Sequence, residues 1–314
     1  MVAGTRQGRI VAALARVAAP LALLPRAGAA SAIPDADPKP PTPQLLSSKL
    51  GVLESAIVDD GGRLFITSQT WAGPTRGAVL RLDRPGASPV VIARINSPGG
   101  LAFDERGQLI VGFGDSVAGG LIGNVVGRAG LMLLDPNGGE PRTWVRGLGM
   151  ANGIARAPDG TIFASNDLGT HIERIDAEGS VERRWAKLWS ANGLAIDPTG
   201  RYLYAAQTFA RAAIRRIELA HPENVTTHAS PGLPAAAASL DGLAMDPAGQ
   251  LYVAASGAGQ IWRVDTDGTI WALARGLSFP SAVALGRGPD GFSEGNLYAV
   301  TFSGEIIALP GAAR

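Results

Sequence analysis

The chain has 314 residues, of which 46% are hydrophobic and 18% are charged, and it contains 42 Gly, 22 Pro and no Cys. Such a low charge with so many turn residues excludes a coiled coil, a helical bundle or a disordered chain, and favours short strands joined by turns. Without Cys, disulfides, thiolate zinc sites, iron–sulfur clusters and a cysteine nucleophile are all excluded. The formal net charge of +1 gives no electrostatic reason to expect a nucleic-acid partner.

Residues 1–32 have the pattern of an export signal. A basic start is followed by an apolar stretch at 10–24 and by small residues at 27–32 that offer several cleavage sites. We predict that this signal peptide is removed and that the protein is exported, to the periplasm or the extracellular space. Arg16 interrupts the apolar stretch, so an uncleaved amphipathic anchor is the alternative.

Residues 33–48 are expected to form a Pro-rich linker, because 34–43 is rich in Pro and has no apolar periodicity. No later stretch is long and apolar enough to span a bilayer, so we expect no transmembrane segment in the mature chain. The remaining residues, 49–314, are expected to form one domain.

One short phrase recurs six times in this domain: an apolar pair, a turn that ends in Gly, and an alternating strand. The turn glycines are Gly62, Gly107, Gly160, Gly200, Gly249 and Gly295. A third strand follows in most repeats, so each repeat of about 45 residues holds two tight hairpins, as does a four-stranded propeller blade. The sequence therefore predicts an all-β, six-bladed β-propeller with four-stranded antiparallel blades. A pair of β-sandwiches is the rival, but sandwiches do not repeat one phrase at this period.

Polar residues recur just ahead of the first strand of the repeats. In a propeller this strand lines the central channel, so equivalent positions ahead of it converge at one mouth of the channel. The polar residues at these positions are Glu54, Asn152, Asn192 and Asp241. Together they would place two carboxylates and two amide oxygens around one point.

Oxygen ligands from several directions suit a hard divalent cation, with Ca²⁺ expected and Mg²⁺ or Mn²⁺ as alternatives. Zn²⁺ is disfavoured, because His171, His221 and His228 occupy no shared repeat position and Cys is absent. The alternative needs no metal, because Asn-Gly and Asp-Gly are common turn dipeptides. The loop that leads into each blade could require them for its own conformation.

These residues resemble the gluconolactonase and regucalcin (senescence marker protein) family of six-bladed propellers. The resemblance rests on Glu54, Asn152-Gly, Asn192-Gly and Asp241-Gly, and it covers residues 50–310 or so. It implies a divalent metal held at the channel mouth by Glu54, Asn192 and Asp241. It also implies that Asn152 contacts the substrate or a metal-bound water.

The strand end at Asn166-Asp167 is similar to the paraoxonase branch of this architecture, in which an Asn-Asp pair joins the calcium shell. This likeness makes Asn166 a candidate for a further ligand or substrate contact, and a plain strand-end turn is the alternative. The chain also departs from the family. Ser55 follows Glu54 where Gly-Pro and an aromatic are usual, and Met150 replaces an Arg that grips sugar lactones. Asp115 falls near the position of the paraoxonase His.

The resemblance implies an exported, metal-dependent hydrolase of lactones or related esters, in which the cation polarises the substrate carbonyl while water attacks. Asp241 is the first candidate for the general base, ahead of Glu54 and Asp167. His171 is expected to be a structural or surface residue. Most of the six Trp are expected to pack in strands or between blades, although Trp71 could edge the pocket. The alternative is a binding propeller whose cation is structural, or which has none.

Overall fold

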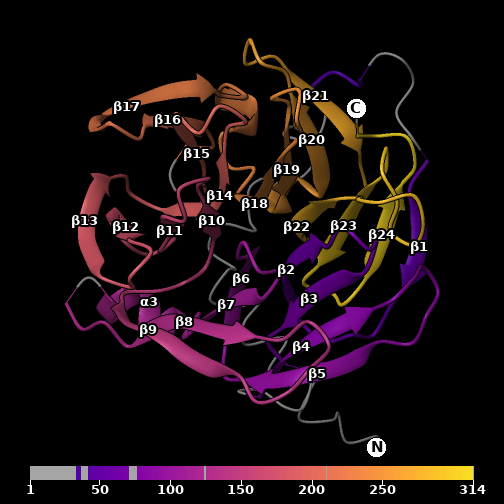
Figure 1. Ribbon diagram of the computed structural model, residues 1–314. Coiled ribbons are helices and arrows are strands. Elements are labelled where there is room, and N and C mark those ends of the chain that lie inside the picture. Colours follow the sequence, from indigo (N-terminus) through magenta and orange to yellow (C-terminus); the bar gives the residue numbers. More distant parts are fainter. Residues whose placement is uncertain (1–32, 37–41, 71–75, 124, 210, 314) are drawn as a thin grey trace, which may run out of the picture.

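The computed structural model of the chain describes residues 33–36, 42–70, 76–123, 125–209 and 211–313. The predicted signal peptide and Trp71 lie outside these residues. Within them the chain forms six four-stranded antiparallel sheets arranged as a ring around a central axis (Figure 1). No helix of the described residues is long and apolar enough to cross a membrane. The predicted six-bladed propeller is therefore confirmed.

In the first five blades the strands follow the chain outward from the axis, as Figure 1 shows. The first blade comprises β2 Leu53–Val58, β3 Leu64–Ser68, β4 Gly77–Leu82 and β5 Val90–Ile95. The second comprises β6 Pro98–Phe103, β7 Leu109–Phe113, β8 Ala129–Leu134 and β9 Arg142–Leu148. The third comprises β10 Ile154–Arg156, β11 Ile162–Ala164, β12 His171–Ile175 and β13 Val181–Lys187.

The fourth blade comprises β14 Ala191–Ile196, β15 Tyr202–Gln207, β16 Ile214–Glu218 and β17 His221–Ala229. The fifth comprises β18 Leu240–Met245, β19 Leu251–Ala255, β20 Gln260–Val264 and β21 Ile270–Ala274. The sixth comprises β22 Pro280–Leu285, β23 Leu297–Thr301, β24 Ile306–Leu309 and, as its outer strand, β1 Gln44–Ser47. The other elements are α3 Val117–Gly123 and the short 3₁₀ helices η1 Leu233–Ala235 and η2 Ser256–Ala258.

The sixth blade closes the ring by taking its outer strand from the start of the described chain. β1 pairs antiparallel with β24. This strand falls inside the stretch expected to be linker, so the propeller begins before residue 49. Residues 33–36 also contact the ring: Ala36 N donates to Ala272 O at 3.0 Å, and Ile33 and Ala36 are buried.

The core lies between neighbouring blades, because most residues of the second strands are buried on both faces. Strand β3, for example, is fully buried, and its Leu64 and Ile66 pack with Tyr298 and Val300 of the sixth blade. Each sheet thus needs its neighbours on both sides to cover its apolar faces. This mutual covering holds the first residues of the inner strands in fixed positions around the axis.

Candidate functional site

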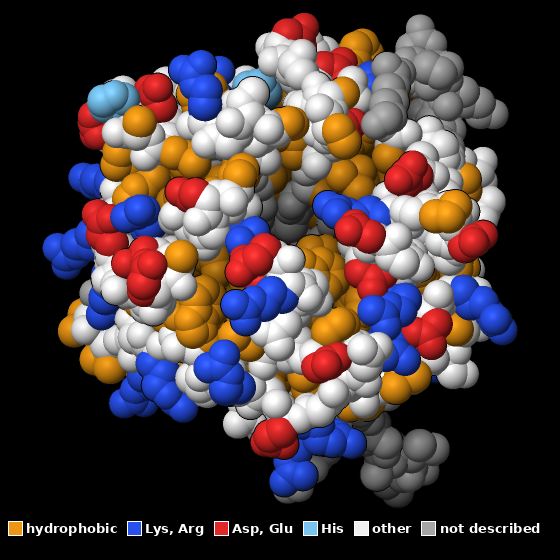
Figure 2. All heavy atoms as spheres, viewed as in Figure 1, with side chains coloured by type: hydrophobic (Ala, Val, Ile, Leu, Met, Phe, Trp, Pro, Cys, Tyr) orange, Lys and Arg blue, Asp and Glu red, His pale blue; other side chains and the backbone are white. Residues whose placement is uncertain are grey.

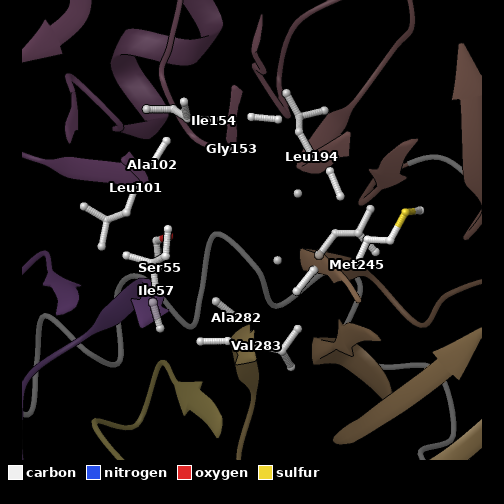
Figure 3. A pocket seen from close by; sticks show the side chains of 18 of the residues that line it. Ser55, Ile57, Leu101, Ala102, Gly153, Ile154, Leu194, Met245, Ala282 and Val283 are labelled. Atoms are coloured by element: carbon white, nitrogen blue, oxygen red, sulfur yellow. The ribbon is translucent and has the colours of Figure 1, made fainter. Parts of the chain in front are cut away.

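The inner strands enclose a central channel with a volume of about 390 Å³. Figure 3 shows the mainly apolar side chains that point into it, among them Ile57, Leu101, Leu194 and Val283. The predicted polar residues Glu54, Asn152, Asn192 and Asp241 line the channel where the inner strands begin. All four are buried, with exposed fractions of 4–8%. The structure therefore brings the four axial residues together at one end of the channel.

The glycine that follows Asn152, Asn192 and Asp241 has a packing role. A Cβ on Gly153 would lie 2.3 Å from Asn192 O, and one on Gly193 would lie 2.4 Å from Asp241 O. A Cβ on Gly242 would lie 2.6 Å from Ala282 Cα. Only Gly allows such close approach of the neighbouring backbone. The Asn-Gly and Asp-Gly dipeptides thus let adjacent inner strands converge. This close approach explains why the dipeptides recur at the same position in successive repeats.

The backbone also turns sharply just before several axial positions. Ser97, Ser190, Ser239 and Phe279 have left-handed φ angles of 46–59°, and each precedes the first residue of an inner strand. The register then shifts across the axial residue, as between Ala191 and Leu194 in β14 and between Leu240 and Leu243 in β18. Such conformations are sparsely populated for residues other than Gly, and bulges redirect side chains. The repeated turn and bulge direct the axial side chains to the channel mouth.

Two further residues, Gln69 and Asp115, belong to the same cluster. Gln69 Nε2 donates to Asp115 Oδ2 at 2.7 Å and lies 3.3 Å from Glu54 Oε2. Asn152 Nδ2 lies 3.5 Å from Glu54 Oε1 and 3.4 Å from Asp115 Oδ1. Two side-chain amides from the first and third blades therefore connect two carboxylates from the first and second blades.

Asp241 has a separate set of partners on the other side of the mouth. Ser256 Oγ donates to Asp241 Oδ2 at 3.2 Å, and the side chain of Asn192 is also hydrogen-bonded to Asp241. The same hydroxyl is also within hydrogen-bonding distance of Pro280 O. Asp241 is thus held between the fourth blade and the start of η2, as a positioned group rather than a mobile one.

Four carboxyl groups at this mouth have raised pKa values. Burial, followed by repulsion from Asp115, Asp241 and Asp167, raises the pKa of Glu54 well above its ordinary value. Burial and the charge of Asp167 raise the pKa of Asp115 to about 8. Burial also raises the pKa of Asp167 to about 6, and burial followed by the charge of Asp167 raises that of Asp241. In the described residues no Lys or Arg offsets these shifts, so the cluster is short of positive charge.

Asn166 and Asp167 differ in how their side chains are engaged. Asn166 Nδ2 donates to Gly120 O at 3.2 Å, and its Oδ1 accepts from Leu168 N at 3.0 Å. The contacts of Asn166 therefore run to α3 and to its own turn, away from Glu54. Asp167 Oδ1 is buried without a hydrogen-bond partner. Of the two side chains, Asp167 therefore has the oxygen that is not already used by a hydrogen bond.

His171 lies away from the axial cluster. Its Nδ1 is 2.9 Å from Thr170 Oγ1, and it lines a smaller cavity of about 270 Å³ together with Glu173 and Arg183. Burial, followed by the charges of Arg184 and Lys187, lowers the pKa of His171. His171 therefore lies outside the set of groups that can act together at the mouth.

The donor set fits a hard divalent cation. The buried carboxylates repel one another and have only neutral hydrogen-bond donors as partners, which is the arrangement a cation would relieve. Within the described ranges, no group of three or more His, Asp or Glu already surrounds a single metal-sized point. The predicted ligands Glu54, Asn192 and Asp241 include only two carboxylates, and the amide oxygen of Asn192 would complete the set.

Gln69 and Asp115 were not predicted as site residues. Both follow the second strand of their blades, as Asn166-Asp167 and Ser256 do. Because the second strand runs antiparallel to the inner one, its end returns to the mouth where the inner strand begins. Polar residues that follow the second strand of a blade therefore indicate the channel mouth, as do polar residues just ahead of the first strand.

The ring of six blades with a polar mouth defines the class of six-bladed β-propellers, and solved structures share this fold. A gluconolactonase from Xanthomonas campestris matches with a TM-score of 0.65 and 18% identity over 88% of this chain and 97% of that one. A calcium-binding regucalcin from Agrobacterium tumefaciens matches with a TM-score of 0.63 and 18% identity over 86% and 94%. A nidogen/laminin complex matches with a TM-score of 0.57 and 22% identity over 72% and 83%.

Within this class, residues 164–301 match the family model described as SMP-30/Gluconolactonase/LRE-like region. The resemblance to the gluconolactonase and regucalcin family is thereby confirmed. No curated protein matches the chain.

Proposed function

We propose that the protein is an exported, divalent-metal-dependent hydrolase of lactones or related esters. The observation that carries the proposal is the group of four carboxyl groups at the channel mouth, which are the buried Glu54, Asp115 and Asp241 and the half-buried Asp167. No Lys or Arg of the described residues offsets their charges. The match to the gluconolactonase-like family model supports a lactonase-type reaction. The regucalcin likeness favours Ca²⁺ as the cation.

Glu54, Asn192 and Asp241 would hold the cation, because they come from three inner strands that converge on the channel mouth. When bound, the cation supplies a Lewis acid that polarises the substrate carbonyl and stabilises negative charge on its oxygen. Ser256 keeps Asp241 oriented through its 3.2 Å hydrogen bond. Asn152 lies beside Glu54 and Asp115 and would orient the substrate with its side-chain amide.

Asp167 is the residue best placed to take the proton from the attacking water. A carboxylate that holds a cation is a weaker proton acceptor, so Asp241 is better suited to the cation than to the proton. Asp167 Oδ1 has no hydrogen-bond partner, and the charge of Asp167 acts on both Glu54 and Asp241. We therefore place the proton on Asp167 Oδ1.

A panel of aliphatic lactones, sugar lactones and aryl esters tests the proposal, assayed with added Ca²⁺ and with chelator. We expect hydrolysis that requires the ion, with aliphatic or aryl substrates favoured because Met150 stands where sugar-lactone enzymes use Arg. Asp241→Ala should abolish activity even with excess ion, Asn152→Ala should lower turnover while ion binding persists, and His171→Ala should be nearly silent. Full activity of Asp241→Ala would contradict the mechanism.

The second candidate is a binding propeller with a structural cation or none. The nidogen/laminin likeness favours it, because the same fold occurs there in a protein complex. Absence of hydrolysis on the whole panel, with the ion demonstrably bound, would support this candidate.

A further inference from the structure

Large apolar side chains are exposed mainly at one end of the propeller. The exposed ones at this end, here called the apolar rim, are Val117, Leu121, Ile122, Val125, Val126, Trp189, Phe209, Leu233 and Phe279. They lie in loops that lead from a second to a third strand, or from an outer strand to the next inner strand. Those loops meet at the end where the inner strands begin, so the rim surrounds the carboxylate mouth. Elsewhere among the described residues only Leu45 and Val90 are comparably exposed.

In helix α3 the small residues, and not the large apolar ones, face the protein. Its Gly120 and Gly123 face the protein, where added Cβ atoms would lie 3.0 Å from Met150 Sδ and 2.3 Å from Gly149 O. Its Leu121 and Ile122 are 63% and 42% exposed, and Val125 just beyond is 82% exposed. A surface helix ordinarily does the reverse, burying its large apolar residues. The apolar side chains of α3 are therefore not used to pack against the described part of the chain.

The side chain of Trp189 adds to the same surface. Trp residues were expected to pack in strands or between blades, yet Trp189 is 54% exposed in the loop between β13 and β14. Trp185, four residues earlier, is buried against Phe163 with ring centroids 4.5 Å apart. Trp189 is thus an exception to this expectation, because its side chain lies in a loop and is exposed.

The exposed charges at this end are basic. They are Lys49, Arg76, Arg128, Lys187 and Arg211. Among described residues of the same loops, the acidic residues are buried in the mouth, apart from Glu305, which is half-buried, and Asp167 with its buried oxygen. An apolar surface flanked by exposed basic residues is complementary to a membrane with anionic headgroups.

The opposite end of the propeller differs from the apolar rim both in its exposed charges and in having no comparable group of exposed large apolar side chains among the described residues. Its hairpin loops are rich in acidic residues, many of which accept backbone hydrogen bonds within their turns, as Asp104 does from Arg106 N and Gln108 N. Figure 2 shows this end, where red and blue groups lie side by side around the hollow at the centre. The acidity there has a local cause in turn chemistry, and no apolar rim accompanies it.

From these observations we propose that the apolar rim docks the propeller on an anionic phospholipid surface, with the carboxylate mouth facing the lipid. The aliphatic and aromatic side chains would enter the boundary between headgroups and acyl chains, and the basic residues would lie against the lipid phosphates. This association does not depend on hydrolysis, so the proposal stands apart from the proposed function.

Co-sedimentation of the full chain tests the proposal, using vesicles of phosphatidylcholine with phosphatidylglycerol and vesicles of phosphatidylcholine alone. We expect clear binding to the first and much weaker binding to the second. Leu121→Ser/Val125→Ser should weaken partitioning more than about tenfold, because two large apolar side chains no longer enter the apolar part of the bilayer. The matched control Leu45→Ser/Val90→Ser removes two exposed apolar side chains that lie outside the apolar rim. It retains the same N-terminal residues 1–32, so it should bind as the wild type does.

A second pair of variants tests the charge. Arg128→Gln/Arg211→Gln should lower partitioning on the anionic vesicles about 25-fold, at roughly fivefold for each basic residue lost near the surface. The control Arg84→Gln/Arg106→Gln, at the opposite end, should have no effect.

Equal binding of the rim and control variants, or no preference for anionic vesicles, would overturn the proposal. So would a lipid-free dimer, seen by sedimentation, that the Leu121→Ser/Val125→Ser change converts to a monomer. That result would assign the rim to a second copy of the chain.

Discussion

The side-chain amide of Gln69 donates a 2.7 Å hydrogen bond to Oδ2 of Asp115, and this bond joins the first blade to the second at the channel mouth. Gln69 also lies 3.3 Å from Glu54 Oε2. The bond therefore holds two buried carboxyl groups near one another although their charges repel. A neutral amide can position these groups, but it supplies no full positive charge to balance them.

Because no positive charge balances these carboxylates, we predict that the ion-free protein loses stability as the pH rises. The folded-state pKa values of Asp115 and Asp167, about 8 and about 6, exceed the ordinary value of 3.8. An acid with a raised folded-state pKa stabilises the fold fully below its unfolded pKa and loses that contribution as the pH rises through the folded pKa. In chelator, the melting temperature should therefore fall between about pH 4 and pH 8. Asp115→Asn should flatten this dependence, and a flat wild-type profile would contradict the raised pKa values.

Asp167→Asn tests the assignment of the proton acceptor. The change keeps the shape of the side chain and removes its ability to take a proton at Oδ1. Turnover should fall by about 10²–10⁴, as is usual when a general base is lost, while the affinity for Ca²⁺ falls much less than in Asp241→Ala. The measurement is lactone hydrolysis at saturating ion, combined with calorimetric titration of Ca²⁺. Unchanged turnover in Asp167→Asn would show that another group takes the proton.

Gly193→Ala tests whether close packing between blades positions the site. The added Cβ would lie 2.4 Å from Asp241 O and Leu243 N, so the neighbouring inner strand must shift. We expect a loss of about 1–3 kcal/mol in the free energy of unfolding, together with weaker Ca²⁺ binding because Asp241 moves. Gly61→Ala is the control, since its Cβ would meet nothing closer than 3.4 Å. Equal melting curves for the two variants would contradict the packing role.

Much of this architecture could be predicted from the sequence, because each blade repeats one local pattern. The hairpin glycines mark the blades, and the axial positions of Glu54 and Asp241 follow from the topology of inner strands. The closing strand β1 could not be predicted in this way, because it pairs with β24 from the far end of the chain and carries no repeat.

Asp115 and Gln69 were harder to predict for a different reason. The loops that follow second strands vary in length and sequence, so no common spacing aligns their polar residues. The exposure of Trp189 was missed because a loop residue has no periodicity from which burial can be inferred. Local repeats therefore predicted the ring and its axis, whereas contacts between loops of different blades required the structure.

The most direct test of the central claim is the melting temperature measured across a Ca²⁺ titration, for the wild type and for Glu54→Gln/Asp241→Asn. The ligands come from separate blades, so the site exists only in the folded ring, and an ion that binds it must stabilise the fold. We predict stabilisation of about 2.7 kcal/mol when the free ion reaches about 100 times its dissociation constant, and loss of most of this effect in the double variant. Identical melting curves of the wild type in Ca²⁺ and in chelator would contradict a cation site at the channel mouth.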